Sequence, residues 1–285
     1  MRRASLLLLL LVLSCSLRAS TSWAPAPGTL VVVGGGGTPD EVVAHALELA
    51  GGSKAKVAVL PFASSREDRG VPTVEMWQEA GAAEVWNLDD PAAGDAAERL
   101  SEANLIWMPG GDQTRLIREL KERGLLELVR ERHAAGVVAG GTSAGAAVMS
   151  LRMLTGPPRE DGLLIERANV SEGLGLWPGV IVDQHFVQRD RYGRLLSAVL
   201  DKPELVGVGI SERTAAIVTF ERKGRDRYVP TIEVLGQSSV LVVDARSAEV
   251  AEGEPGALHG ALGLSLDVLK PGMKVRLEAK GGRAK

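Results

Sequence analysis

The sequence predicts an α/β protein with a predominantly parallel sheet flanked by helices. Runs of apolar residues with the length of a strand alternate with helical stretches through the first 150 residues or so, which is typical of βαβ units. Several of these runs are apolar throughout, as expected of strands that are covered on both faces. The 285 residues are 45% hydrophobic and 24% charged, an ordinary globular balance.

The elements can be assigned in order along the chain. Thr29–Val33 is the first expected strand, and after Gly34–Gly37 a helix begins near Pro39, with Asp40 and Glu41 in its first turn. Further strands are expected at Lys56–Phe62, Glu84–Leu88, Asn104–Met108, Val137–Ala139, Val180–Val182, Val206–Ile210, Ala216–Phe220, Ile232–Leu235 and Val240–Val243. Further helices are expected at Val74–Ala80, Asp95–Ala103, Thr114–Lys121, Leu125–His133, Ala144–Leu151 and Arg191–Leu200.

Residues 1–24 are predicted to be a signal peptide or a lipoprotein leader, followed by a single domain over residues 25–285. Arg2 and Arg3 precede the apolar run Leu6–Leu13, which is too short to span a bilayer. The segment that ends in Cys15 resembles a bacterial lipobox, so lipidation of Cys15 would anchor the protein to a membrane. Cleavage after Ala19 or Ala24 would instead release it. Both alternatives predict a secreted, periplasmic or extracellular protein, or one that is lipid-anchored at the cell envelope.

Composition excludes several kinds of partner and site. The net charge is −3, and residues 1–24 contribute only positive charge, so the rest of the chain is more acidic still. An acidic domain with few aromatic residues argues against a nucleic-acid partner. Cys15 is the only cysteine, which excludes a disulfide framework and a cysteine-ligated zinc site. We expect no metal and no cofactor. In particular, the Gly34–Gly37 run is not expected to be a dinucleotide-binding loop, because Pro39 stands where such a loop needs its third glycine.

A candidate nucleophile follows the strand expected at Val137–Ala139. The segment Gly141-Thr142-Ser143-Ala144-Gly145 stands between that strand and a helix. A G-x-S-x-G motif in this context is typical of a nucleophile elbow, a sharp turn that exposes the serine hydroxyl. The N–H of Ala144, together with those of Gly110 and Gly111 after the Asn104–Met108 strand, could stabilise a developing oxyanion.

A serine nucleophile requires a base, and His185 is the best candidate among the four histidines. It alone stands at the carboxyl end of an expected strand, where ligands gather in parallel sheets. The acid that orients the histidine is expected between the serine and the histidine, at Glu160 or Asp161.

Together these residues resemble the cyanophycinases, which share a serine peptidase family with aspartyl dipeptidase. The resemblance extends over about residues 28–244 and is carried by Gly110-Gly111-Asp112-Gln113, Gly140–Ala146, Asp183-Gln184-His185-Phe186, Arg189-x-Arg191-x-x-Arg194-Leu195, Gly207–Glu212, Thr214-Ala215, Leu235-Gly236 and Val240–Asp244. It implies a class I glutamine amidotransferase-like, flavodoxin-like fold and a Ser-His-acid exopeptidase that releases β-Asp-Arg dipeptides from cyanophycin. It also implies substrate contacts at Gln113, Asp183, Gln184, Arg189, Arg191 and Arg194.

Other functions remain as alternatives. A glutamine amidotransferase would need a cysteine in the elbow, and Cys15 lies in the leader. An α/β-hydrolase esterase usually has its histidine near the end of the chain, whereas about a hundred residues follow His185. Aspartyl dipeptidase or isopeptidase activity stays open, as does a catalytically silent module that binds anions or peptides. The expected partner is cyanophycin or a β-aspartyl peptide, and assembly into a homodimer is left open.

Overall fold

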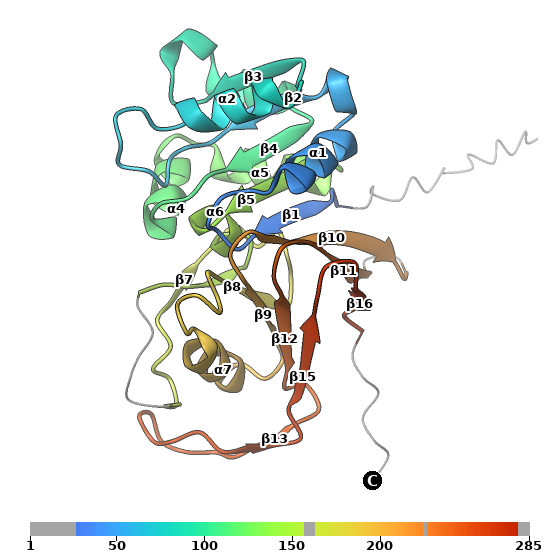
Figure 1. Cartoon of the computed structure of the whole chain (residues 1–285). Coiled ribbons are helices and arrows are strands. Elements are labelled where there is room, and N and C mark those ends of the chain that lie inside the picture. The colour runs from blue at the N-terminus through green and yellow to red at the C-terminus, as the bar shows by residue number, and fades with distance from the viewer. Residues whose placement is uncertain (1–26, 157–162, 225–226, 279–285) are drawn as a thin grey trace, which may run out of the picture.

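The computed structural model describes residues 27–156, 163–224 and 227–278, and two sheets organise this part of the chain (Figure 1). The larger sheet has eight strands in the order β16-β11-β10-β1-β5-β4-β2-β3. The strands β1, β5, β4, β2 and β3 run parallel, whereas β10, β11 and β16 are antiparallel. Their bounds are β1 Leu30–Val33, β2 Lys56–Val59, β3 Glu84–Asn87, β4 Leu105–Met108, β5 Val138–Thr142, β10 Thr214–Arg222, β11 Tyr228–Gly236 and β16 Lys274–Arg276. The predicted α/β class is confirmed, with a mixed sheet.

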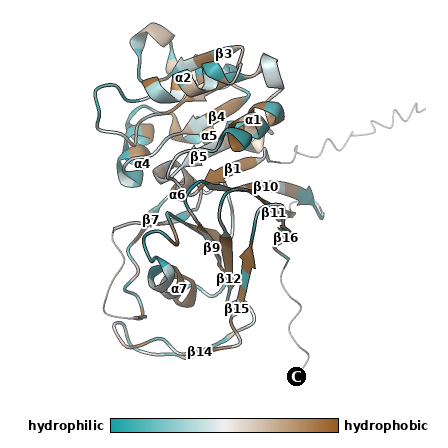
Figure 2. Ribbon diagram, in the orientation of Figure 1, coloured by the Kyte–Doolittle hydropathy of each residue, from teal (hydrophilic) through white to brown (hydrophobic). Residues whose placement is uncertain are grey.

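Helices cover both faces of the parallel half of this sheet. Along β1, Val31 and Val33 pack with the helices α1 and α2, while Leu30 and Val32 pack with α3, α4, α5 and α6 on the opposite face. This explains why the strand is apolar throughout: each face is covered (Figure 2). The helices are α1 Asp40–Leu49, α2 Val71–Glu79, α3 Ala96–Glu102, α4 Gln113–Glu122, α5 Leu126–Ala134, α6 Ala144–Ala147 and α7 Tyr192–Asp201, with the short 3₁₀ turns Gly52–Lys54 and Pro91–Ala93.

The second sheet has four strands in the order β15-β12-β9-β8 and lies beside α6. Val182 and Val208 on one face join the main core, whereas Ile181 and Leu241 on the other face pack against α7. The bounds are β8 Val180–Gln184, β9 Val206–Ile210, β12 Val240–Asp244 and β15 Ser265–Leu269. Two small hairpins complete the described strands: β6 Arg152–Leu154 with β7 Val170–Glu172, and β13 Glu249–Val250 with β14 Ala261–Leu262.

Most of the expected helices have shifted bounds in the structure; the helix expected at Val74–Ala80, for example, is Val71–Glu79. The helix expected at Ala144–Leu151 ends at Ala147, because the carbonyls of Val148 and Met149 accept hydrogen bonds from Leu174 and Trp177 rather than from a further helical turn. The helix expected from Arg191 begins at Tyr192, with Arg191 as its N-cap residue.

The predicted leader and Cys15 lie outside the described residues. Within residues 27–156, 163–224 and 227–278, the structure contains no helix that is long and apolar enough to cross a membrane. The anchoring of the chain through Cys15 stays a prediction. The prediction of a single domain over residues 25–285 also stays a prediction.

Strand order brings the motif-bearing loops together. β5 lies between β1 and β4, with Thr142 paired to Val33 and Gly141 paired to Met108. The three strands are parallel, so the turns at their carboxyl ends meet at one edge of the sheet. Gly34–Gly37, Pro109–Asp112 and Ser143 are therefore neighbours in space.

Candidate active site

Ser143 stands directly after β5 and is the N-cap residue of α6. Its backbone has φ 55° and ψ −111°, a conformation that L-residues rarely adopt. Its N–H donates to the carbonyl of Val33 at 3.1 Å. The turn is tight because Gly145 approaches β4 closely: a Cβ on Gly145 would lie 1.8 Å from the carbonyl oxygen of Met108. Small residues beside Ser143 therefore allow the chain to reverse and leave the hydroxyl clear of the core.

His185 contacts this hydroxyl from the end of β8. Its Nε2 lies 2.9 Å from Oγ of Ser143, and its backbone N–H donates to the carbonyl of Gly34 at 2.6 Å. The residue is buried, with 7% of its surface exposed, and it has a positive φ of 49°. The histidine predicted from the sequence is therefore in hydrogen-bond reach of the predicted serine, the distance at which a base can activate a hydroxyl.

Glu212 supplies the carboxylate that contacts the other ring nitrogen. Its Oε1 lies 2.5 Å from Nδ1 of His185, and its backbone N–H donates to the side chain of Gln188 at 2.9 Å. The acid was expected at Glu160 or Asp161, which lie outside the described residues. The carboxylate in contact follows the histidine rather than preceding it, because β9 is the parallel neighbour of β8 and Glu212 follows β9. The signal in the sequence was the Gly207–Glu212 motif, in which the acidic residue Glu212 follows an expected strand.

The electrostatic surroundings favour the neutral form of His185. Burial lowers the pKa of His185 below its ordinary value of 6.5, and the positive charges of Arg189 and Arg191 lower this pKa further. The hydrogen bond and the negative charge of Glu212 oppose this by raising the pKa. The net lowering leaves the imidazole neutral and able to accept a proton near pH 7.

Two of the three predicted oxyanion donors border Ser143. Ala144 is the next residue, and a Cβ on Gly110 would lie 3.2 Å from Cβ of Ser143. Gly111 packs instead against Ala63, whose carbonyl oxygen would lie 2.3 Å from a Cβ at position 111. The backbone N–H groups of Gly110, Gly111 and Ala144 donate no hydrogen bond to another described residue. Gly110 and Ala144 thus border the serine with N–H groups that no other described residue engages.

Asp183 and Arg194, both predicted to contact substrate, instead pair with each other in the interior. The carboxylate of Asp183 is fully buried, and Nε and Nη2 of Arg194 donate to its two oxygens. The remaining Nη1 of Arg194 donates to the carbonyl of Gly156 at 2.5 Å. This corrects the expectation of direct contact for these two residues, because the groups that would bind substrate are already engaged with the protein.

Arg191 links this buried pair to the site. Its Nη1 donates to the carbonyl of Gln184 at 2.6 Å and lies 3.4 Å from Oδ1 of Asp183. Burial lowers the pKa of Arg191 to about 10, and the neighbouring charge of Arg194 contributes to this shift. Its Nε is buried and has no hydrogen-bond partner among the described residues. Two arginines face one carboxylate, so a net positive charge lies behind the end of β8.

The other predicted substrate residues differ in exposure, because Gln184 is buried whereas Gln113 is partly buried and Arg189 is exposed. The Ser143 hydroxyl lies 3.4 Å from Oε1 of Gln184. Gln113, the first residue of α4, is partly buried and donates through Nε2 to the carbonyl of Leu154 at 2.9 Å. Arg189 is exposed and lies close enough to His185 to affect its pKa. Gln184 therefore borders the serine directly, and Arg189 is the exposed cation beside the histidine.

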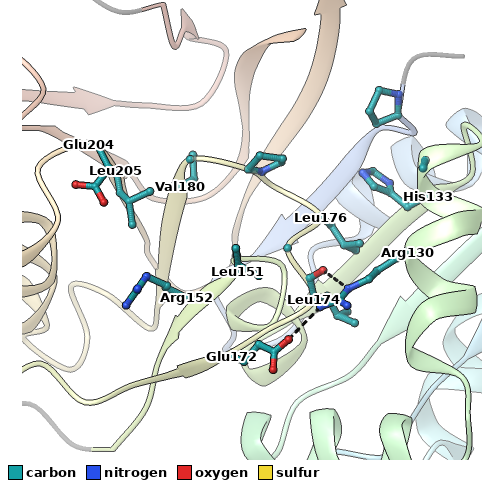
Figure 3. A pocket seen from close by; sticks show the side chains of 15 residues that line it. Arg130, His133, Leu151, Arg152, Glu172, Leu174, Leu176, Val180, Glu204 and Leu205 are labelled. Atoms are coloured by element: carbon teal, nitrogen blue, oxygen red, sulfur yellow. Dashed lines mark hydrogen bonds and ion pairs between the residues drawn. The ribbon is translucent and has the colours of Figure 1, made fainter. Parts of the chain in front are cut away.

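A cavity of about 640 Å³ lies elsewhere, and none of Ser143, His185 and Glu212 lines it (Figure 3). Its wall includes His133, a histidine that is 3% exposed and whose pKa burial lowers to about 4. Both ring nitrogens of His133 are inaccessible and lack hydrogen-bond partners among the described residues. Among all the residues that the structure describes, no group of three or more His, Cys, Asp or Glu residues is arranged to hold a metal ion.

Several known proteins resemble this chain in sequence, and a solved structure resembles it in fold. A cyanophycinase from Geminocystis herdmanii is 39% identical over 245 residues, which cover 79% of this chain and 86% of that protein. A cyanophycinase from a Nostoc species is 35% identical over 283 residues, covering 92% and 89%. A solved peptidase structure from an acI-B1 actinobacterium aligns with a TM-score of 0.58 at 22% identity, covering 89% of this chain and 98% of that one, and supports the fold.

The family model of peptidase family S51 matches residues 30–223, a range that contains Ser143, His185 and Glu212. The match spans the parallel strands, the second sheet as far as β9, and the loops that meet at the serine. With the hydroxyl, the imidazole and the carboxylate in contact inside the matched range, the chain belongs to peptidase family S51 and is a serine-type peptidase.

Proposed function

We propose that this peptidase hydrolyses cyanophycin and releases β-Asp-Arg dipeptides from the polymer. The observation that carries the proposal is the contact chain Ser143–His185–Glu212 in a protein 35–39% identical to cyanophycinases over most of its length. Cyanophycin has an aspartate backbone whose side-chain amides bear arginine, so each unit presents a carboxylate and a guanidinium. The exposed guanidinium of Arg189 beside His185 supports recognition of the carboxylate.

In this mechanism Ser143 is the nucleophile of an elbow at the end of β5. Its Oγ attacks the backbone carbonyl carbon and its proton passes to Nε2 of His185, while Glu212 stabilises the imidazolium through Nδ1. The N–H groups of Gly110 and Ala144 bind the oxyanion. His185 then gives the proton to the leaving amine as the C–N bond breaks. Water repeats the sequence on the acyl-enzyme, which restores the hydroxyl and releases the acid.

The test is incubation of the purified protein with insoluble cyanophycin granules and mass analysis of the soluble products. We expect β-Asp-Arg from the wild-type protein, and a loss of roughly 10⁴–10⁶-fold in rate for Ser143→Ala, since removal of a triad member has effects of this order. A fluorophosphonate should label the wild-type protein and not the variant. Turnover by folded Ser143→Ala would overturn the mechanism.

Substrate preference is tested by comparing kcat/KM for a β-Asp-Arg oligomer, an α-Asp dipeptide and p-nitrophenyl acetate. We expect the oligomer to be preferred. Arg189→Ala should lower kcat/KM for the charged substrates only, by roughly ten- to a hundredfold, the effect of losing one charge-assisted contact. Preference for the dipeptide would indicate an aspartyl dipeptidase. Preference for the ester would indicate a general hydrolase, and binding without turnover would indicate a silent module.

We also propose that the enzyme acts outside the cytoplasm. The support is the basic pair Arg2 and Arg3 before the apolar run Leu6–Leu13, followed by Cys15. Expression of the full chain with a carboxyl-terminal tag, fractionation and mass analysis of the mature N-terminus test this proposal. A lipidated Cys15 at the mature N-terminus would indicate membrane anchoring, and a mature N-terminus at Ser20 or Pro25 would indicate free secretion. A cytoplasmic protein that retains Met1 would overturn the proposal.

A further inference from the structure

The glycine-rich turn after β1 accepts hydrogen bonds from His185 and from Arg213, the residue next to Glu212. The carbonyl of Gly34 accepts from the N–H of His185 at 2.6 Å. The carbonyl of Gly35 accepts at 2.8 Å from the N–H of Arg213, the residue that follows Glu212. One turn therefore holds the segment that carries the imidazole and the segment that carries the carboxylate.

Gly35 also lies against the imidazole ring itself. A Cβ built on Gly35 would lie 2.3 Å from Cε1, 2.4 Å from Nε2 and 2.8 Å from Nδ1 of His185. Carbon atoms in contact are about 3.5–4.0 Å apart at their optimum, so these distances are severe overlaps. The ring cannot yield easily, because Ser143 holds Nε2, Glu212 holds Nδ1 and the residue is 7% exposed.

The neighbouring glycine has the same relation to the carboxylate. A Cβ on Gly36 would lie 2.7 Å from both Cβ and Oε2 of Glu212. Gly37 differs, since it has a φ of 96°, nearly that of Gly35 at 98°, but a Cβ there would meet nothing within 4 Å. A side chain would therefore meet the same left-handed φ at positions 35 and 37, but it would overlap the imidazole only at position 35.

We propose that Gly35 is a positioning residue for His185, an inference that rests on the proposed function. Its bare Cα is the surface against which the imidazole lies, and this surface sets the ring plane in which Nε2 reaches Ser143 while Nδ1 reaches Glu212. Any side chain at position 35 would displace the ring from one of these partners. Gly35 has no side chain to take part in the reaction and acts through the position of the His185 ring.

The first experiment compares Gly35→Ala with two control variants, Gly37→Ala and Gly81→Ala. Gly81 lies in the loop after α2, has a φ of 92° and has open space at its Cβ position, so it reports the effect of backbone strain far from the site. We expect Gly35→Ala to lose on the order of 10²-fold or more in kcat with little change in KM, since a displacement of about 1 Å can have this effect. Both controls should keep kcat within a few fold. A low-field Nδ1 proton signal from the His185–Glu212 pair should change only in Gly35→Ala.

The second experiment measures the same contact through stability and needs no activity. Gly35→Ala is made in the wild-type protein and in His185→Ala, where the ring is absent, and the Tm of all four proteins is compared. We expect Gly35→Ala to lower Tm clearly in the wild-type protein and much less in His185→Ala. Gly37→Ala should lower Tm equally in both backgrounds.

These measurements separate this inference from the proposed function. Equal kcat for Gly35→Ala and Gly37→Ala, or equal Tm losses in the two backgrounds, would overturn the positioning role and leave Ser143-dependent hydrolysis untouched. If Gly35→Ala folds only when the imidazole is absent, the role is supported; failure to fold in both backgrounds would contradict it. Absence of hydrolysis by the wild-type protein would refute the proposed function alone, because the proton signal and Tm comparison remain valid.

Discussion

Oε1 of Glu212 lies 2.5 Å from Nδ1 of His185, although the two residues are 27 positions apart along the chain. The two residues follow β8 and β9, which are parallel neighbours in the second sheet. Ser143 approaches the same ring from the other side, out of the larger sheet. The contact chain therefore joins the two sheets, and its geometry depends on how they pack.

Replacement of Glu212 tests the identity of the acid. We expect Glu212→Gln to lower kcat by roughly 10⁴-fold, because an amide at Nδ1 favours the wrong tautomer and cannot stabilise the imidazolium. Glu160→Gln and Asp161→Asn serve as controls and should retain activity. Loss of activity in either control with retention in Glu212→Gln would return the acid to the position expected from the sequence.

The pH dependence of kcat/KM tests the environment of His185. The base must be neutral, so activity is lost as pH falls through the pKa of His185, which burial sets below 6.5. The acidic limb should therefore have its midpoint below pH 6.5. Arg189→Gln removes a positive charge that lowers this pKa and should move the midpoint upward. An unchanged midpoint in Arg189→Gln would show that this charge does not act on the imidazole.

The buried group of Asp183, Arg191 and Arg194 predicts a strong effect on stability. Asp183→Asn would leave two buried guanidinium groups without their anion, and breaking a buried ion pair in this way typically destabilises by about 3–5 kcal/mol. Urea unfolding would measure the loss. Asp68→Asn breaks the exposed pair with Arg66 and should leave the unfolding curve unchanged. Equal curves for the two variants would contradict a structural role for Asp183.

His133 predicts a loss of stability in mild acid. The pKa of His133 is about 4 in the folded protein against 6.5 ordinarily. As pH falls, this imidazole is therefore protonated in the unfolded chain before it is protonated in the folded protein. Stability is fully present above pH 6.5 and falls as pH decreases toward 4, by about 2 kcal/mol at pH 5. Urea unfolding of wild-type protein and His133→Leu at pH 7.5 and 5 measures this. The variant should lose less stability between the two pH values; equal losses would show that His133 is not responsible.

The sequence by itself determined the elements that are defined by local patterns. The apolar run before Gly34 and the small residues around Ser143 predict a strand, a turn and a helix, because strand burial and turn sterics depend on residues close in the chain. His185 could be identified for the same reason, since its place after Val180–Val182 is a local property. These predictions needed no knowledge of which strands pair.

Only the tertiary structure decided which distant groups meet. Glu212 contacts His185 because β9 pairs with β8, and Arg194 lies against Asp183 because α7 packs on the outer face of that sheet. The family resemblance implied substrate contact for Arg194, but neither a motif nor helical spacing tells what the face of a helix covers. Strand order and packing arise from the burial of the whole apolar surface at once, so the acid, the buried ion pair and the antiparallel half of the sheet appear only when the chain is folded.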